Sequence, residues 1–176
     1  MILSYTTGIH SLADFLKPWQ SLFSNSKVIS DGITFLHLGG LLFAGGFAIA
    51  ADRATFRALG GGSDERAILL AELKDVHRPV LIGLGVLFGS GILLATSDVE
   101  TFGTSPTFLI KMTLVALLLV NGVMLQRTEN ALRERSPSEA GDVDDQLLWR
   151  KLRHTAVASI TLWTSILLAG TILVNS

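Results

Sequence analysis

The strongest constraint on the fold of this chain is a set of four long apolar runs, at residues 33–51, 79–96, 107–125 and 155–174. Each run is about 18 to 20 residues long, which as an α-helix measures about 27 to 30 Å, the thickness of the hydrocarbon part of a bilayer. Lys111 is the only formal charge inside them. Because the backbone in lipid must satisfy its own hydrogen bonds, these runs predict membrane-spanning helices.

Composition agrees with a membrane location. Charged residues make up 16% of the chain, against about a quarter in a soluble domain. The alternative, a soluble bundle of very apolar helices, requires a polar face on each helix, and these runs have almost none. We therefore predict an all-α fold, an integral membrane up-down four-helix bundle over residues 29–176, with spans at about 31–52, 78–97, 106–127 and 153–174.

The first 28 residues predict a separate amphipathic helix. Apolar side chains recur there at helical spacing, but the segment is too short and polar to span a bilayer. Two placements follow from this pattern. The helix lies along the membrane interface with Trp19 as an anchor, or it packs over the mouth of the bundle.

Basic residues predict the orientation of the spans. The two long loops at 53–77 and 128–152, together with the residues bordering them, contain most of the Lys and Arg residues, namely Arg53, Arg57, Arg66, Lys74, Arg78, Arg127, Arg133, Arg135, Arg150, Lys151 and Arg153. The opposite side has only Lys17 and Lys27. The positive-inside rule then places both loops in the cytoplasm and both termini outside, in a multi-pass protein of the cell (inner) membrane.

Two histidines stand at the cytoplasmic start of a span and predict a cofactor site. His77 and His154 lie at the same depth, on helices that run in parallel, so they are candidate axial ligands of a b-type haem. The expected inward face of the last span runs from His154 through Ala158, Thr161 and Ser165. The alternative is that both histidines belong to the basic collar at the interface.

His37 lies deeper, about one turn inside the first span, where an ionisable side chain is a functional candidate. Met112 lies at a similar depth on the third span, and His37 with Met112 would form a second haem site. The alternative is a hydrogen bond from His37 to a neighbouring helix. Lys111 is expected to extend toward the outer surface, and Asn121 to find a polar partner on another helix.

Glycines crowd the first two spans. Gly39, Gly40, Gly45 and Gly46 lie in the first, and Gly85 and Gly89 of the second have the GxxxG spacing that lets helix backbones approach closely. Two interpretations stay open. The glycines mark helix–helix contacts, or they clear room for a flat porphyrin.

The stretch GSGILLATSDVETFGTSPTFLIKMTLVALLLVNGVML combines a glycine-rich span, a short outer link, F-x-x-K and an asparagine about ten residues on. With LHLGGLLFAGGF earlier in the chain, it resembles the copper-resistance D (CopD)-like group and the small four-helix membrane proteins related to b-type membrane cytochromes. The likeness covers about the middle two-thirds of the chain. Carried over residue by residue, the resemblance points to His37, Lys111 and Asn121.

These observations predict b-haem binding and electron transfer in or at the membrane, with His77, His154 and His37 as the metal ligands. The alternatives are a non-catalytic subunit or assembly partner of a larger respiratory-type complex, and copper or small-solute transport. Copper transport is disfavoured because the chain has no cysteine and three methionines. The expected partners are the lipid bilayer, other membrane or redox proteins, and further copies of the chain.

Several function classes are disfavoured by the same sequence. It contains no phosphate-binding glycine loop and no nucleophile paired with a base. No paired carboxylates are evident within the apolar runs, which argues against a carboxylate proton relay. Nucleic-acid binding is not expected, because the net charge is −1 and the basic residues are explained by membrane orientation.

Overall fold

The chain is all-helical in a computed structural model, which describes residues 2–135 and 142–174, and the side chains within 13–135 and 142–173. No β-strand occurs in these ranges. Six helices are described: α1 (Ile2–Asn25), α2 (Lys27–Leu59), α3 (Ser63–Ser97), α4 (Val99–Thr104), α5 (Pro106–Arg133) and α6 (Val143–Val174).

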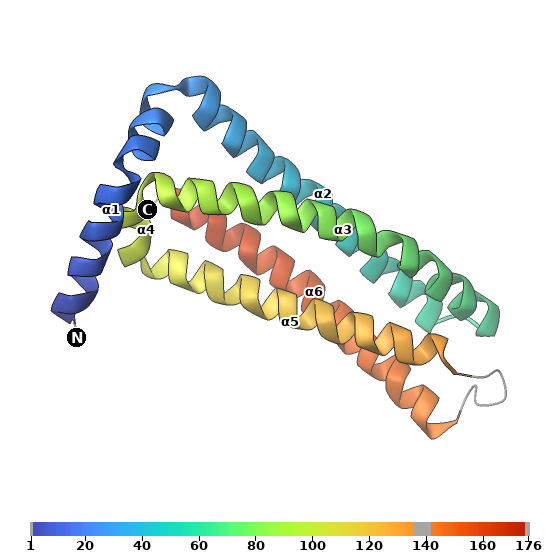
Figure 1. Cartoon of the computed structure of the whole chain (residues 1–176). Helices are drawn as coiled ribbons and strands as arrows, with labels where there is room; N and C mark the ends of the chain where they lie inside the picture. Colours follow the sequence, from blue (N-terminus) through green and yellow to red (C-terminus); the bar gives the residue numbers. More distant parts are fainter. Residues whose placement is uncertain (1, 136–141, 175–176) are drawn as a thin grey trace.

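The four long helices α2, α3, α5 and α6 run alternately in opposite directions (Figure 1). α2 packs mainly on α3, and α5 on α6, so the helices form two hairpins, joined chiefly by contacts of α2 with α6. We call the end with the α2–α3 turn the link end; α5 ends and α6 begins there too. The opposite end, with α1, α4 and the end of α6, is the α1 end.

Each of these four helices is long and apolar enough to cross a membrane, which confirms the sequence prediction of an all-α chain with four such segments. The helices extend beyond the predicted spans. α2 continues to Leu59 and α3 begins at Ser63, so most of the predicted loop 53–77 is helical. The loop 128–152 is shortened in the same way by α5 and α6.

Local capping explains where two of the helices begin. Ser105 accepts a hydrogen bond from the backbone N–H of Phe108 at 3.3 Å, and Pro106 occupies the first turn of α5. Asp142 precedes α6 and accepts from the N–H of Asp145 at 2.8 Å. That N–H, together with the guanidinium of Arg135, holds the pKa of the Asp142 carboxyl below its usual value.

α1 lies across one end of the four long helices and packs on α3 there (Figure 1). The indole N–H of Trp19 donates to the carbonyl oxygen of Leu93 on α3 at 3.3 Å. α1 also contacts α4 and α2. These contacts match the second of the two predicted placements, a helix over the mouth of the bundle.

Close packing of α2 on α3 depends on two glycines. A Cβ at Gly40 would lie 2.9 Å from the backbone nitrogen of Leu87, and one at Gly83 would lie 3.0 Å from Ala44. The predicted contact through Gly85 and Gly89 is wrong, because a Cβ at either position would have no atom within 4 Å. The GxxxG spacing is present, but it faces away from α2.

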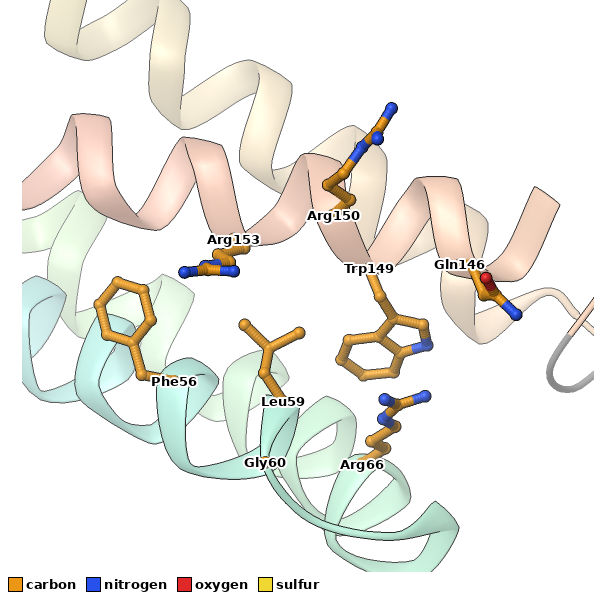
Figure 2. Close-up of a pocket in the computed structure, with 8 residues that line it drawn as sticks. All are labelled: Phe56, Leu59, Gly60, Arg66, Gln146, Trp149, Arg150 and Arg153. Carbon is orange, nitrogen blue, oxygen red and sulfur yellow. The ribbon is translucent and has the colours of Figure 1, made fainter. Parts of the chain in front are cut away.

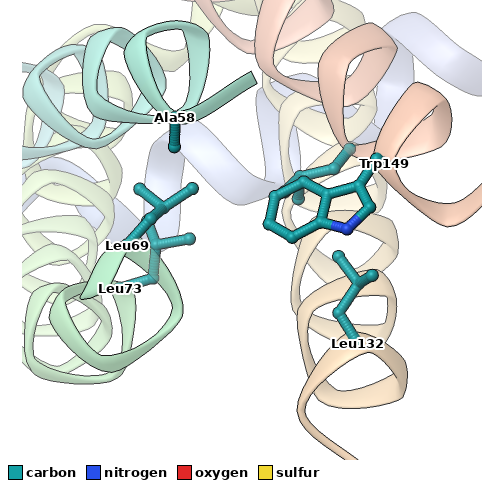
Figure 3. Packing of buried hydrophobic residues seen from close by; sticks show 6 residues of the cluster. Ala58, Leu69, Leu73, Leu132 and Trp149 are labelled. Atoms are coloured by element: carbon teal, nitrogen blue, oxygen red, sulfur yellow. The ribbon is translucent and has the colours of Figure 1, made fainter. Parts of the chain in front are cut away.

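Two apolar clusters hold the hairpins together. At the link end, Trp149 of α6 points toward α2 and the start of α3, with the Arg66 guanidinium 4.9 Å from the centre of its ring (Figure 2). Trp149 also packs with Leu132 of α5 and with Ala58, Leu69 and Leu73 on the other side (Figure 3). The second cluster lies nearer the α1 end and contains Ala44, Leu118, Trp163 and Ile166.

The apolar residues of the long helices mostly face outward. Large side chains such as Phe35, Leu42 and Leu81 are exposed, and Leu42 is 76% exposed. The buried residues of α2 are small or polar, namely Gly40, Ala44, Gly45, Asp52, Thr55 and Ala58. This distribution is the reverse of a water-soluble bundle, where the large apolar side chains form the core.

Candidate functional site

The polar interior of the link half is built partly by one face of α5. Asn121, Leu125, Thr128 and Leu132 recur at intervals of three or four residues, and Glu129 lies on the same face. Asn121, Thr128 and Glu129 are all buried. The amide of Asn121 donates to the backbone carbonyl of Thr155 on α6 at 3.0 Å, which supplies the partner on another helix that the sequence predicted.

Glu129 is the most deeply buried acid in the described side chains, with 1% of its surface exposed. Its Oε2 atom lies 3.5 Å from Nε2 of His77 on α3 and 3.8 Å from Nη2 of Arg133, one turn further along α5. Both distances exceed that of a good hydrogen bond. Neither carboxylate oxygen of Glu129 has a hydrogen-bond partner among the described residues.

Asp52 supplies a second buried acid from α2, with 2% of its surface exposed. Its carboxyl interacts with the hydroxyl of Ser159 on α6, and it lies near enough to Glu129 for that charge to act on it. Its Oδ2 atom has no hydrogen-bond partner among the side chains described. Two carboxyls and an imidazole from three helices therefore gather in one interior region, which we call the acidic cluster: Asp52, His77 and Glu129.

Both acids of the cluster lie outside the apolar runs, within which the sequence contains no paired carboxylates. In the sequence prediction, Asp52 is the last residue of a span and Glu129 belongs to a charged loop. Neither side chain is therefore expected in the interior of the helix assembly. What identifies them is the helical spacing of the inward-facing residues, which continues beyond the apolar runs. Asp52, Thr55 and Ala58 extend the inward face of α2, as Thr128 and Leu132 extend that of α5.

Hydrogen-bond geometry limits the protonation states of the cluster. Nδ1 of His77 lies 2.6 Å from the carbonyl oxygen of Leu73, and since a carbonyl only accepts, Nδ1 carries the proton. The contact of Nε2 with Glu129 is then attractive only when a second proton resides on Nε2 or on the carboxyl. The two acids also repel each other in a low-dielectric interior. With Nδ1 protonated, His77 and Glu129 can share one further proton between Nε2 and the carboxyl.

His77 connects the acidic cluster to the surface of the molecule. Its side chain is 28% exposed, whereas that of Glu129 is 1% exposed. A proton taken up by the imidazole at Nε2 is already beside the Glu129 carboxyl.

A second polar group lies toward the α1 end. Nδ1 of His37 lies 3.2 Å from the hydroxyl of Ser90 on α3. Since that hydroxyl donates to the carbonyl of Val86 at 2.7 Å, the imidazole is the donor to it. This is the hydrogen bond to a neighbouring helix that was one of the two interpretations of His37. The ring rests on Gly91, where a Cβ would come within 3.2 Å of it.

Lys111 does not simply extend outward. It is half-buried, and its Nζ atom lies 3.6 Å from where a Cβ of Gly170 on α6 would be. Its charge also acts on His37. The Lys111 side chain therefore reaches α6 at Gly170, at a distance where a Cβ would make an ordinary van der Waals contact.

Apolar side chains separate these two polar regions. Ala44, Leu118, Trp163 and Ile166 form the buried cluster between them. Trp163 packs on Gly45, where a Cβ would lie 3.3 Å from the indole ring. The acidic cluster therefore lies on the link-end side of this apolar cluster, and His37 and Lys111 lie on the α1-end side.

The residues predicted to bind haem do not fit that group in this arrangement. His154 is exposed, and the buried face of α6 contains Leu152, Thr155, Ala156, Ser159, Trp163 and Ile166 instead of the predicted one. His77 directs Nε2 at Glu129 rather than at His154. Met112 is 39% exposed. Trp163 packs on Gly45, whereas a Cβ at Gly39 or Gly46 would have no atom of the described chain within 4 Å.

A metal centre built from protein side chains is not evident either. Within the described ranges, no group of three or more His, Asp or Glu residues is arranged to hold a metal ion. No protein-family model, curated protein or solved structure matches this chain. The resemblance to the CopD-like group therefore stays a prediction from sequence.

Proposed function

We propose that this chain is a multi-pass membrane protein, an up-down bundle of four spanning helices, that takes up and releases a proton at the acidic cluster as part of a proton-coupled process. The observation that carries this proposal is the gathering of Asp52, Glu129 and His77 from three helices in the interior of the link half. Ionisable residues inside membrane bundles typically belong to proton relays or ion pathways.

The membrane location is supported by the outward-facing apolar surface. In water, each 100 Å² of such surface left exposed forgoes about 2.5 kcal/mol of stabilisation. In lipid the same side chains are solvated, and helix association depends on small residues and on interhelical hydrogen bonds. Gly40, Gly83 and the Asn121–Thr155 bond supply these contacts.

The proton-coupled role is supported by the one-sided access of the cluster. His77 is partly exposed near the link end, and the apolar cluster around Trp163 lies toward the α1 end. This arrangement suits a protein that couples proton uptake to another event.

Infrared difference spectroscopy tests the proposal on the purified chain in lipid. A pH step that changes the protonation of a carboxyl changes its C=O stretching band. We expect the wild-type chain to show a carboxylic-acid band that responds to the step and is removed by the variants described in the Discussion. A response unaffected by substituting both acids would overturn the proposed function.

The orientation of the spans can be tested with introduced cysteines, because the natural chain has none. Asp64 at the start of α3 and Thr101 in α4 are exposed at opposite ends. With the link end in the cytoplasm, a membrane-impermeant maleimide on intact cells should label Thr101→Cys. It should label Asp64→Cys only after permeabilisation. The opposite pattern would reverse the proposed topology.

Haem binding and electron transfer remain a prediction from the sequence, with its own test. A reduced-minus-oxidised spectrum of the purified chain should show a b-type band if haem is bound, and the band should disappear in both His77→Ala and His154→Ala. The exposure of His154 leads us to expect no dependence on that residue. The subunit and copper-transport alternatives likewise stay predictions, tested by copurification with a larger complex and by copper-dependent growth.

A further inference from the structure

A pocket of about 460 Å³ lies at the link end, between α2, the start of α3 and α6 (Figure 2). Three guanidinium groups line it, from Arg66, Arg150 and Arg153. None of the three forms an ion pair with a carboxylate among the described residues, whose ion pairs all involve other cations. The pocket therefore has an uncompensated positive charge.

Arg66 is the most constrained of these three side chains. Its guanidinium lies over the Trp149 ring, 4.9 Å from the ring centre. Its Nε atom is buried without a hydrogen-bond partner in the part of the chain described. A buried donor of this kind, in a pocket that Arg150 and Arg153 also line, is suited to an anionic oxygen.

The remaining wall of the pocket is apolar and includes Phe56, Leu59 and Trp149. Arg153 stands at the predicted boundary of the last span, where the headgroup region of a bilayer would lie. A ligand with a phosphate group and an adjoining apolar part could contact the arginines through its phosphate and the apolar side chains through its apolar part. Basic pockets between helices on the cytoplasmic side are typical sites for anionic lipid headgroups.

We propose that this pocket binds a phosphate group through Arg66, Arg150 and Arg153, supplied by an anionic phospholipid headgroup or by free phosphate. Guanidiniums are suited to this because their planar N–H groups pair with phosphate oxygens two at a time. The lipid source rests on the membrane location proposed above. The pocket itself is separate from the acidic cluster, since the two have no residue in common.

The test uses the purified full-length chain in a neutral detergent, with native mass spectrometry to count bound ligand. Short-chain phosphatidylglycerol, phosphatidylcholine of equal chain length, and inorganic phosphate are titrated separately. We expect phosphatidylglycerol to bind, and the double variant Arg150→Gln/Arg153→Gln to bind it about tenfold more weakly. Both arginines are exposed, so their substitution should leave the fold intact.

The matched control is Arg78→Gln/Arg127→Gln, which removes two exposed charges in the same half of the molecule but outside the pocket. Inorganic phosphate that binds with the same sensitivity to Arg150 and Arg153 would identify free phosphate as the source. Binding of the lipid alone would identify the headgroup. Equal binding of phosphatidylcholine, or an equal loss in the control, would overturn the proposal.

The same variants separate this proposal from the proton-coupled one. Arg150→Gln/Arg153→Gln should retain the infrared response of the acidic cluster. Substitution of Glu129 should retain the binding of phosphatidylglycerol. Either site can therefore fail its test without affecting the other.

Discussion

The Glu129→Gln and Asp52→Asn variants are each expected to lose the infrared signal of one carboxyl when the pH is stepped, and the double variant to lose both. Gln and Asn keep the size and polarity of the replaced side chains, but their amide groups do not take up or release a proton when the pH is stepped. Where proton transfer by such a group limits turnover, its removal lowers the rate on the order of 100-fold. The measurement is the difference spectrum of each purified variant in lipid.

Glu72→Gln is the matched control, because Glu72 is an exposed acid on α3, five residues from His77. Its substitution should leave the signals of Asp52 and Glu129 unchanged. Both cationic neighbours of Glu129 keep about a quarter of their side-chain surface exposed, although Nε and Nη2 of Arg133 are buried, so the folding of Glu129→Gln is checked by its circular dichroism spectrum. A full response in the double variant would show that these acids do not exchange protons.

The second large effect is expected at Gly40. Gly40→Ala places a Cβ 2.9 Å from the backbone nitrogen of Leu87. Because a backbone atom cannot rotate away, α2 and α3 must separate. Overpacking of this kind costs about 1 to 3 kcal/mol. Thermal unfolding of the purified variant in detergent should show a lower midpoint than that of the wild-type chain.

Gly39 provides a control one position away on the same helix. A Cβ at Gly39 would have no heavy atom within 4 Å. Gly39→Ala should therefore keep the wild-type packing and gain up to about 1 kcal/mol from the higher helix propensity of alanine. If both substitutions had the same effect, close packing of α2 on α3 at Gly40 would be contradicted.

The helices themselves are predictable because their signal is local. Length and apolar composition identify all four long helices, and the pair Ser105 and Pro106 marks the start of α5. Helix faces are harder to predict. Adjacent residues point about 100° apart, so a shift of one position separates the buried Thr155 from the exposed His154.

The sequence does not predict the candidate site, and the reason is different. Asp52 and Glu129 stand near the ends of apolar runs, beside or close to arginines, where a charge is typical of a solvated loop. Helices α2 and α5 continue past the apolar runs, and both acids are buried on the faces that pack against other helices. Which glycine meets a neighbouring helix is equally undetermined by sequence, since Gly39 and Gly40 are the same residue type and differ only in what packs on them.

The amino-acid sequence by itself determined that the chain is helical and that four of its helices have the length and composition to cross a membrane, because these properties depend on residues close together in the chain. The tertiary structure alone decided that His77 lies beside Glu129, that Asp52 is buried near enough to Glu129 to be influenced by its charge, and that His154 faces outward. The reason is that these contacts depend on the rotation and pairing of helices distant in sequence, which packing at positions such as Gly40 and Gly83 sets.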